Sequence, residues 1–206
     1  MDKFIWFLLT FALLLCNCGS HVDSAAPSDQ PAVVTPQPAS SVKSTENSSE
    51  CVRSEPEPVV KKDVFPNTSF RLETNKEFPY QKLGYETVEF KNGDRLLIEH
   101  AGCENFTLIF RFETKRFAAE PADVRFWYRA AVELMSEAEK GIAKSFLIPQ
   151  GLKALNTYPT NDKQLEFDKQ IDFGTGEIRS VVSVNDVKKL ANDRYEIAVA
   201  FGTGPL

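Results

Sequence analysis

FTLIFRFE, residues 106–113, is the segment that decides the fold class. Its apolar and polar residues alternate, and a period of two is the spacing of a β-strand. One face of this strand is rich in aromatic residues and carries Phe106, Leu108, Phe110 and Phe112. Large apolar side chains on one face of a strand belong against a hydrophobic core. The segment therefore predicts a core strand in a β-sheet.

The residues before this strand predict that the sheet is antiparallel. Segments 87–91 and 95–99 flank the dipeptide Asn92-Gly93. This dipeptide readily takes the positive φ angles of a tight hairpin turn. The two segments and residues 106–113 therefore form an antiparallel meander. Residues 70–72 are expected to add an edge strand.

Beyond Pro121 the spacing of apolar residues changes to three and four, which is the period of an α-helix. Pro121 suits a first helical turn, and Gly141 suits a helix stop. The expected buried face comprises Val124, Trp127, Tyr128, Ala131, Leu134, Met135 and Ala138. One main amphipathic helix should therefore pack on the sheet.

Strand patterns return after a connector in which residues 152–156 suggest a short helix. Residues 165–173, 177–190 and 195–201 are the expected further strands, and Gly174-Thr175-Gly176 forms the turn between the first two. The predicted fold class is α+β, with an antiparallel meander, one main helix and then further antiparallel strands. A single sheet covered by the helix is favoured, and two small sheets are the alternative.

The amino terminus has the pattern of an export signal. Phe4–Leu15 is almost wholly apolar, follows Lys3 and is shorter than the roughly 20 residues that cross a bilayer, as in the apolar region of a signal peptide. The following Leu15-Cys16-Asn17-Cys18 resembles a bacterial lipoprotein signal over residues 1–20. That resemblance implies lipidation of Cys18 and a membrane anchor, with residues 1–18 as the signal. The alternative is a plain secretory signal cut near Ser20.

Residues 19–63 are interrupted by six prolines and are rich in Ser, Thr, Gln, Asp and Glu. Such a composition cannot bury enough apolar surface to offset the entropy lost on ordering. The segment is expected to be a disordered tether between the anchor and residues 64–206. The latter residues have the length of one domain.

The charge distribution argues against a nucleic-acid partner. The chain has a net charge of −5, and its basic residues are interspersed with acidic ones. A stripe of Lys and Arg that could follow a phosphate backbone is not visible in the sequence.

Candidate chemistry centres on residues 99–104, EHAGCE. His100 and Cys103 could form a thiolate–imidazole pair, because an imidazolium lowers the pKa of a neighbouring thiol. The alternative is a polar strand end followed by a glycine turn, which the missing orienting residue favours. Structural zinc usually takes four well-spaced donors, so no metal or other cofactor is predicted.

Cys51 and Cys103 remain after removal of the signal and lipidation of Cys18. In an oxidising compartment these two thiols could form a disulfide that fastens the tether to the domain. This hypothesis competes with a nucleophilic Cys103, because an oxidised sulfur cannot act as a thiolate.

Export, the tether and the lack of a coherent catalytic set favour a non-enzymatic binding or envelope-associated domain at the cell envelope. Its expected partners are the membrane, through the lipid anchor, and a protein or other envelope molecule. The alternative is a small secreted hydrolase or thiol enzyme that uses His100 and Cys103.

Overall fold

A computed structural model describes residues 55–205 except 104, 144–146, 162–163 and 176–177. All of these residues belong to the compact unit Glu46–Leu206. The signal sequence, Cys18 and Cys51 lie outside the described residues, so the predictions about them stay predictions. Within the described part of the chain, no helix is long and apolar enough to cross a membrane.

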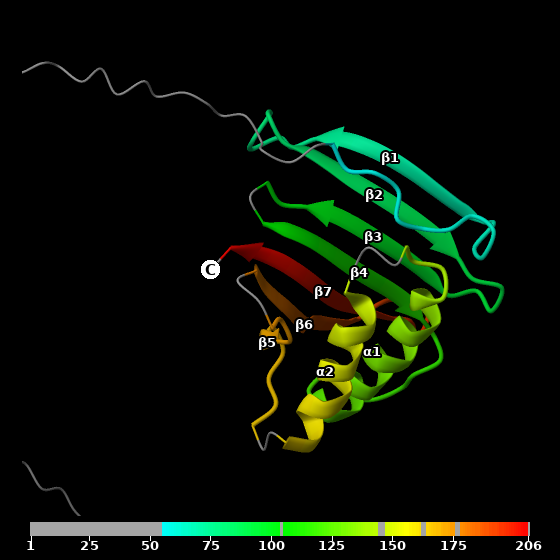
Figure 1. Cartoon of the computed structure of the whole chain (residues 1–206). Helices are drawn as coiled ribbons and strands as arrows, with labels where there is room; N and C mark the ends of the chain where they lie inside the picture. Colours follow the sequence, from blue (N-terminus) through cyan, green and yellow to red (C-terminus); the bar gives the residue numbers. More distant parts are fainter. Residues whose placement is uncertain (1–54, 104, 144–146, 162–163, 176–177, 206) are drawn as a thin grey trace, which may run out of the picture. The chain divides into compact units, whose positions relative to one another are not determined.

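The described residues fold around one seven-stranded sheet in the order β1-β2-β3-β4-β7-β6-β5, and each neighbouring pair is antiparallel (Figure 1). The strands are β1 (Thr68–Thr74), β2 (Lys82–Glu89), β3 (Arg95–Ala101), β4 (Phe106–Thr114), β5 (Ile171–Asp172), β6 (Ile178–Lys189) and β7 (Tyr195–Pro205). The α+β class and the single sheet are therefore confirmed. The order also places β7 beside β4, which joins the meander to the strands that follow the helices.

The predicted meander is formed by β1 to β4. Gly93 lies in the turn between β2 and β3 with φ at +84°, a conformation that glycine adopts without steric cost. Strand β1 lies at the edge of the sheet, as expected for residues 70–72. The aromatic-rich face of β4 is buried, since Leu108, Phe110 and Phe112 are at most 1% exposed.

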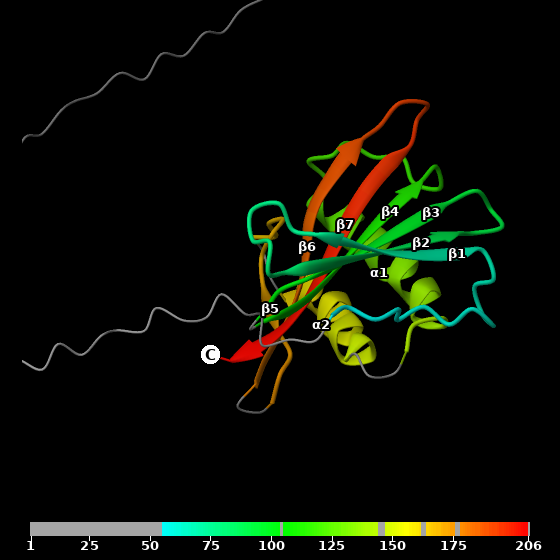
Figure 2. The same cartoon turned by 90° about the horizontal axis from the view of Figure 1, so that it is seen from above.

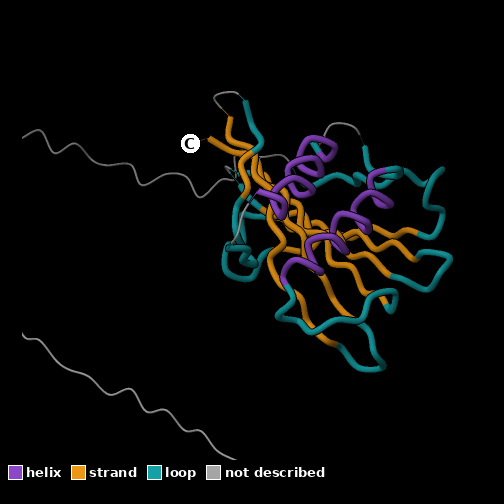
Figure 3. The backbone as a smooth tube through the Cα atoms, turned by 90° about the horizontal axis from the view of Figure 1, so that it is seen from below, coloured by secondary structure: helices purple, strands orange, loops and turns teal. Residues whose placement is uncertain are grey.

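Helix α1 (Val124–Glu139) is the predicted amphipathic helix. It begins at Val124, three residues after Pro121, because the Asp123 carboxylate caps it by accepting the Phe126 backbone N–H at 3.1 Å. Gly141 follows its end, as expected. Figure 3 shows both helices over one face of the sheet, and Figure 2 shows the opposite face without a helix. We call these the inner and outer faces.

Helix α2 (Ile148–Asn161) is longer than the short helix predicted over residues 152–156. Pro149 lies in its first turn, where the missing N–H would have no partner inside the helix. Ile148, Leu152 and Leu155 are buried in the common core. Burial of these side chains stabilises α2, although the proline at position 159 argues against a helix in that part of the sequence.

The strand predicted over residues 165–173 is wrong in its extent, because only Ile171 and Asp172 form β5. Asp168 has a φ of +59°, which interrupts an extended backbone. The Asp168 backbone N–H donates to the Val184 carbonyl at 2.7 Å, so this segment still contacts β6. A bulge between Val184 and Asp186 shifts the register of β6 against β7.

Residues 55–63, which composition assigned to the tether, include two side chains of the core. Val59 and Val60 are 5% and 8% exposed. Val60 forms an isolated antiparallel bridge with Ile142, just beyond α1. Next to this bridge, the Lys61 backbone N–H donates to the Gly141 carbonyl at 2.7 Å. Because prolines surround the two valines, the composition of this stretch predicts a tether and gives no sign of the short segment that contacts the domain.

Candidate functional site

His100, one half of the proposed catalytic pair, lies on the inner face of β3 with 1% of its surface exposed. Its Nε2 lies 2.8 Å from Oε1 of Glu86 on the neighbouring strand β2. A carboxylate only accepts hydrogen bonds, so Nε2 is the donor. Glu86 is also 1% exposed. The imidazole is therefore enclosed with a carboxylate that the sequence analysis did not select.

Glu86 also holds the segment that precedes β1. Its Oε1 accepts the Val59 backbone N–H at 2.7 Å, and its Oε2 accepts the Val60 backbone N–H at 3.0 Å. One buried carboxylate thus accepts three hydrogen bonds, which satisfies the requirement for burying a charge. The pair of Glu86 and His100 fastens residues 59 and 60 to the sheet, which is a structural role.

Cys103 does not supply a thiolate, because it is disulfide-bonded. Its partner cysteine lies outside the described residues, so the pairing with Cys51 stays a prediction. Gly102 has a φ of +97°, and a Cβ added there would lie 1.7 Å from the Asn105 carbonyl oxygen. This turn therefore requires glycine. The structure agrees with a strand end followed by a glycine turn, which was the alternative to a nucleophilic pair.

The acidic residues next to His100 do not complete a site either. Glu99 lies on the outer face, where its Oε1 accepts a hydrogen bond from Arg111 Nε at 2.7 Å. Glu104 lies outside the described residues. Among the residues that the structure describes, no group of three or more His, Cys, Asp or Glu side chains could hold a metal ion.

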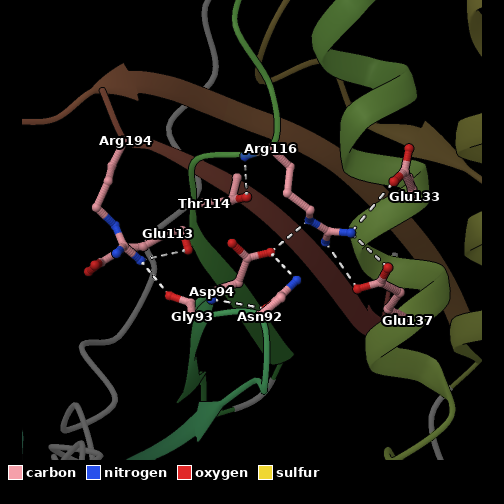
Figure 4. A network of polar contacts seen from close by, with 9 residues as sticks. All are labelled: Asn92, Gly93, Asp94, Glu113, Thr114, Arg116, Glu133, Glu137 and Arg194. Atoms are coloured by element: carbon pink, nitrogen blue, oxygen red, sulfur yellow. Dashed lines mark hydrogen bonds and ion pairs between the residues drawn. The ribbon is translucent and has the colours of Figure 1, made fainter. Parts of the chain in front are cut away.

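A polar network around Arg116 has a structural role as well (Figure 4). Arg116 contacts Asp94 in the β2–β3 turn at 2.7 Å and Glu137 on α1 at 2.7 Å. Burial opposes the charge of Arg116, but the hydrogen bond to Glu137 and the negative charges of Asp94, Glu137 and Glu133 outweigh it and raise its pKa. The network joins the turn, the β4–α1 connection and the helix.

A pocket of about 530 Å³ lies on the inner face at one end of the sheet. Three parts of the fold enclose it: the ends of β4, β6 and β7, the segment after β5, and the start of α2. It is lined by Phe106, Leu147, Ile148, Gln150, Phe173, Gly174, Thr175, Ile178, Ser180, Phe201, Gly202 and Thr203. This volume falls within the range of roughly 300 to 1,000 Å³ that is typical of ligand pockets.

The pocket lining contains no charged side chain among its twelve described residues. Phe106, Phe173 and Phe201 provide aromatic surface, and the polar groups are uncharged hydroxyls and one amide. Ile178 is 64% exposed and Leu147 is 44% exposed, so the pocket opens to solvent beside them. These properties suit an apolar ligand without a formal charge, because a charged group would lose its hydration without gaining a partner.

Close packing of α2 helps to shape this pocket. A Cβ added at Gly151 would lie 2.4 Å from Cε1 of Phe201 and 3.1 Å from Cε1 of Phe173. Glycine therefore allows the helix to approach the two rings. On the sheet side, Gly202 and Gly174 contribute no side chain to the lining.

This pocket could not be predicted from the sequence, because its lining comes from five separate stretches of chain. Phe106 and Phe201 were expected to be core residues at the ends of strands. A weak signal was present in the glycines beside aromatic residues, at Phe173-Gly174 and Phe201-Gly202. The burial of His100 did have a signal in the sequence, because His100 continues the alternation of the buried Leu96 and Ile98.

Comparisons of the chain with protein-family models, curated proteins and solved structures found no match. What the pocket can bind therefore follows from its shape and lining alone.

Proposed function

We propose that the protein is an exported binding domain of the cell envelope, anchored through a lipid at Cys18, that takes an uncharged apolar ligand. The observation that carries this proposal is the pocket of about 530 Å³ on the inner face of the sheet, whose described lining residues include no charged side chain. Pockets that bind small molecules are mostly apolar with a few polar groups, and this lining has that composition.

The environments of the two candidate catalytic residues, His100 and Cys103, support a binding role and not a thiol enzyme. Cys103 is disulfide-bonded, and a disulfide sulfur cannot attack as a thiolate. His100 is buried and directs Nε2 at Glu86. Neither residue lines the pocket.

The anchor is supported by the sequence of residues 1–20 and by the composition that follows. Residues 19–54 comprise 36 positions, and a flexible chain of this length has a root-mean-square reach of roughly 35 Å. The domain would therefore stay near the membrane surface. If Cys18 carries the anchor, Cys18→Ser should move the protein from the membrane fraction to the soluble fraction; an unchanged distribution would contradict this part of the proposal.

Ligand binding is tested with N-phenyl-1-naphthylamine, an uncharged fluorophore whose emission rises in apolar surroundings. The chain from Gly19 onward is suitable, because it retains every described contact without the signal. Ile178→Glu and Leu147→Glu place a carboxylate at the opening, and both positions are exposed enough to tolerate it. Each should weaken probe binding by about tenfold, since an apolar ligand would have to desolvate the charge.

Val64→Glu is the matched control, because Val64 is 40% exposed and does not line the pocket. It should bind the probe as the unmodified chain does. If the unmodified chain does not enhance the fluorescence, or if all three variants bind equally, the pocket is not the ligand site.

A further inference from the structure

Exposed large hydrophobic side chains gather at one end of the sheet. Among the described residues, six such side chains are exposed. Five of them lie at the end that also holds the pocket: Leu72, Phe78, Tyr80, Leu147 and Ile178. Val64, which lies between the bridge at Val60 and β1, is the sixth.

The strand register defines this end. It comprises the β1–β2 turn, the β3–β4 turn, the start of β6 and the end of β7, which lie on the left in Figure 1. Ile178, the first residue of β6, pairs with Pro205, the last residue of β7. The first described residues also lie near it, because a Cβ on Gly84 of β2 would lie 2.8 Å from Cβ of Pro56. The end of the sheet and the entry of the chain into the domain are therefore close together.

The β1–β2 turn, residues 75–81, contributes two of these exposed side chains. Phe78 and Tyr80 are 47% and 45% exposed, and their ring centroids lie 5.9 Å apart with Pro79 between them in sequence. Close to half of each of these two aromatic residues at the turn is exposed to solvent. They are therefore available to an external apolar phase.

Hydrogen bonds hold this turn in place. The Asn75 Oδ1 accepts the backbone N–H groups of Glu77 and Phe78 at 2.9 and 3.3 Å. The Asn75 Nδ2 donates to Gln81 Oε1 at 2.9 Å, and the Asn75 backbone N–H donates to the Gln81 carbonyl at the same distance. The turn presents its aromatic rings from an ordered backbone, so contact with a partner would cost little conformational entropy.

We propose that residues 75–81 insert Phe78 and Tyr80 into the interfacial layer of a lipid bilayer. Aromatic rings with lysines beside them suit this layer, and Lys76 and Lys82 flank the pair. Glu77 leaves residues 75–82 with a formal charge of +1, two lysines minus one glutamate. Apolar contact rather than charge therefore drives the insertion, and an uncharged bilayer surface is sufficient.

A bilayer fits the layout of the exposed apolar side chains better than one small ligand does. The β1–β2 turn and the start of β6 are separated by four strand spacings between β2 and β6, or roughly 19 Å. A broad apolar surface can meet both, whereas one small ligand cannot. The proposed lipid anchor is what would bring the domain within reach of a bilayer, so this part of the inference rests on the proposed function. The affinity of the turn for lipid does not depend on the anchor.

The test measures binding of the chain from Gly19 onward, which lacks the lipid anchor, to vesicles of phosphatidylcholine by co-sedimentation. Phe78→Ser and Tyr80→Ser should each lower the partition coefficient roughly fivefold, because each removes about half of a large side chain from the lipid contact. Val64→Ser, at a similarly exposed side chain elsewhere, should leave it unchanged. Phe78→Ser should also leave probe binding in the pocket unchanged, so that this proposal and the pocket can fail separately.

A second measurement reports position. Tyr80→Trp should be quenched by brominated phosphatidylcholine in the vesicles, whereas Val64→Trp should not be. The native Trp127 is fully buried and provides an unquenched background. The proposal is overturned if the unmodified chain does not sediment with vesicles, if the serine variants bind as it does, or if Tyr80→Trp is not quenched.

Discussion

Replacing Glu86 by glutamine tests the role of the buried carboxylate. Glu86→Gln preserves the size of the side chain and removes one acceptor oxygen. In the native domain, Oε1 accepts from Val59 N and His100 Nε2 at 2.7 and 2.8 Å, and Oε2 accepts from Val60 N at 3.0 Å. A glutamine amide can replace only one of these oxygens, and its NH₂ group then faces a donor.

The magnitude follows from counting the bonds that remain. In the better orientation, the amide oxygen still accepts hydrogen bonds from Val59 and His100. The Val60 N–H is then buried without an acceptor. An unsatisfied buried donor costs about 1 to 3 kcal/mol. The two remaining bonds lose their ionic character, which costs about 0.5 to 1 kcal/mol each. Together these effects should lower the free energy of unfolding by about 2 to 5 kcal/mol.

Equilibrium unfolding in urea, followed by the fluorescence of the buried Trp127, measures this loss. With an m-value of about 2 kcal/mol per molar, the midpoint should fall by about 1 to 2.5 M. Glu99→Gln is the matched control, because Glu99 lies on β3 beside His100 but pairs with Arg111 on the outer face at 25% side-chain exposure. It should cost less than about 1 kcal/mol. If Glu86→Gln unfolds within about 0.5 kcal/mol of the unmodified protein, or costs no more than Glu99→Gln, the carboxylate does not hold residues 59 and 60.

Two further predictions concern the contacts around the domain. Arg116→Met should lower the free energy of unfolding by about 2 kcal/mol, because the 7%-exposed side chain of Asp94 loses its cationic partner; an unchanged urea midpoint would show that the network in Figure 4 adds no net stability. Peptide mapping without reduction should recover Cys103 linked to Cys51, and recovery of Cys103 as a free thiol from an oxidising compartment would contradict both the pairing and its use as a clamp on the tether.

Much of the fold could be predicted from local patterns. The alternation in residues 106–113 predicts β4, and Asn92-Gly93 predicts the turn after β2. The apolar stripe beyond Pro121 predicts α1. These elements carry their signal in a few consecutive residues, because side chains must alternate or recur with the period of the element that buries them.

The errors occurred where the fold overrides the local pattern. The alternation of residues 165–173 resembles a strand, yet Asp168 adopts a positive φ and leaves only a two-residue β5. Helix α2 extends beyond its prediction because its apolar residues find a place in the core. In the same way, Val59 and Val60 contact the end of α1 although their neighbours have the composition of a tether.

The sequence by itself determined the α+β class, the antiparallel meander and the main helix, since each depends on a period or a turn read over a short stretch. Only the tertiary structure decided which distant residues meet. Glu86 lies 26 and 27 positions from the backbone groups it holds, and the pocket draws its lining from five stretches of chain. Such contacts depend on strand order and helix placement, and no local period records either one.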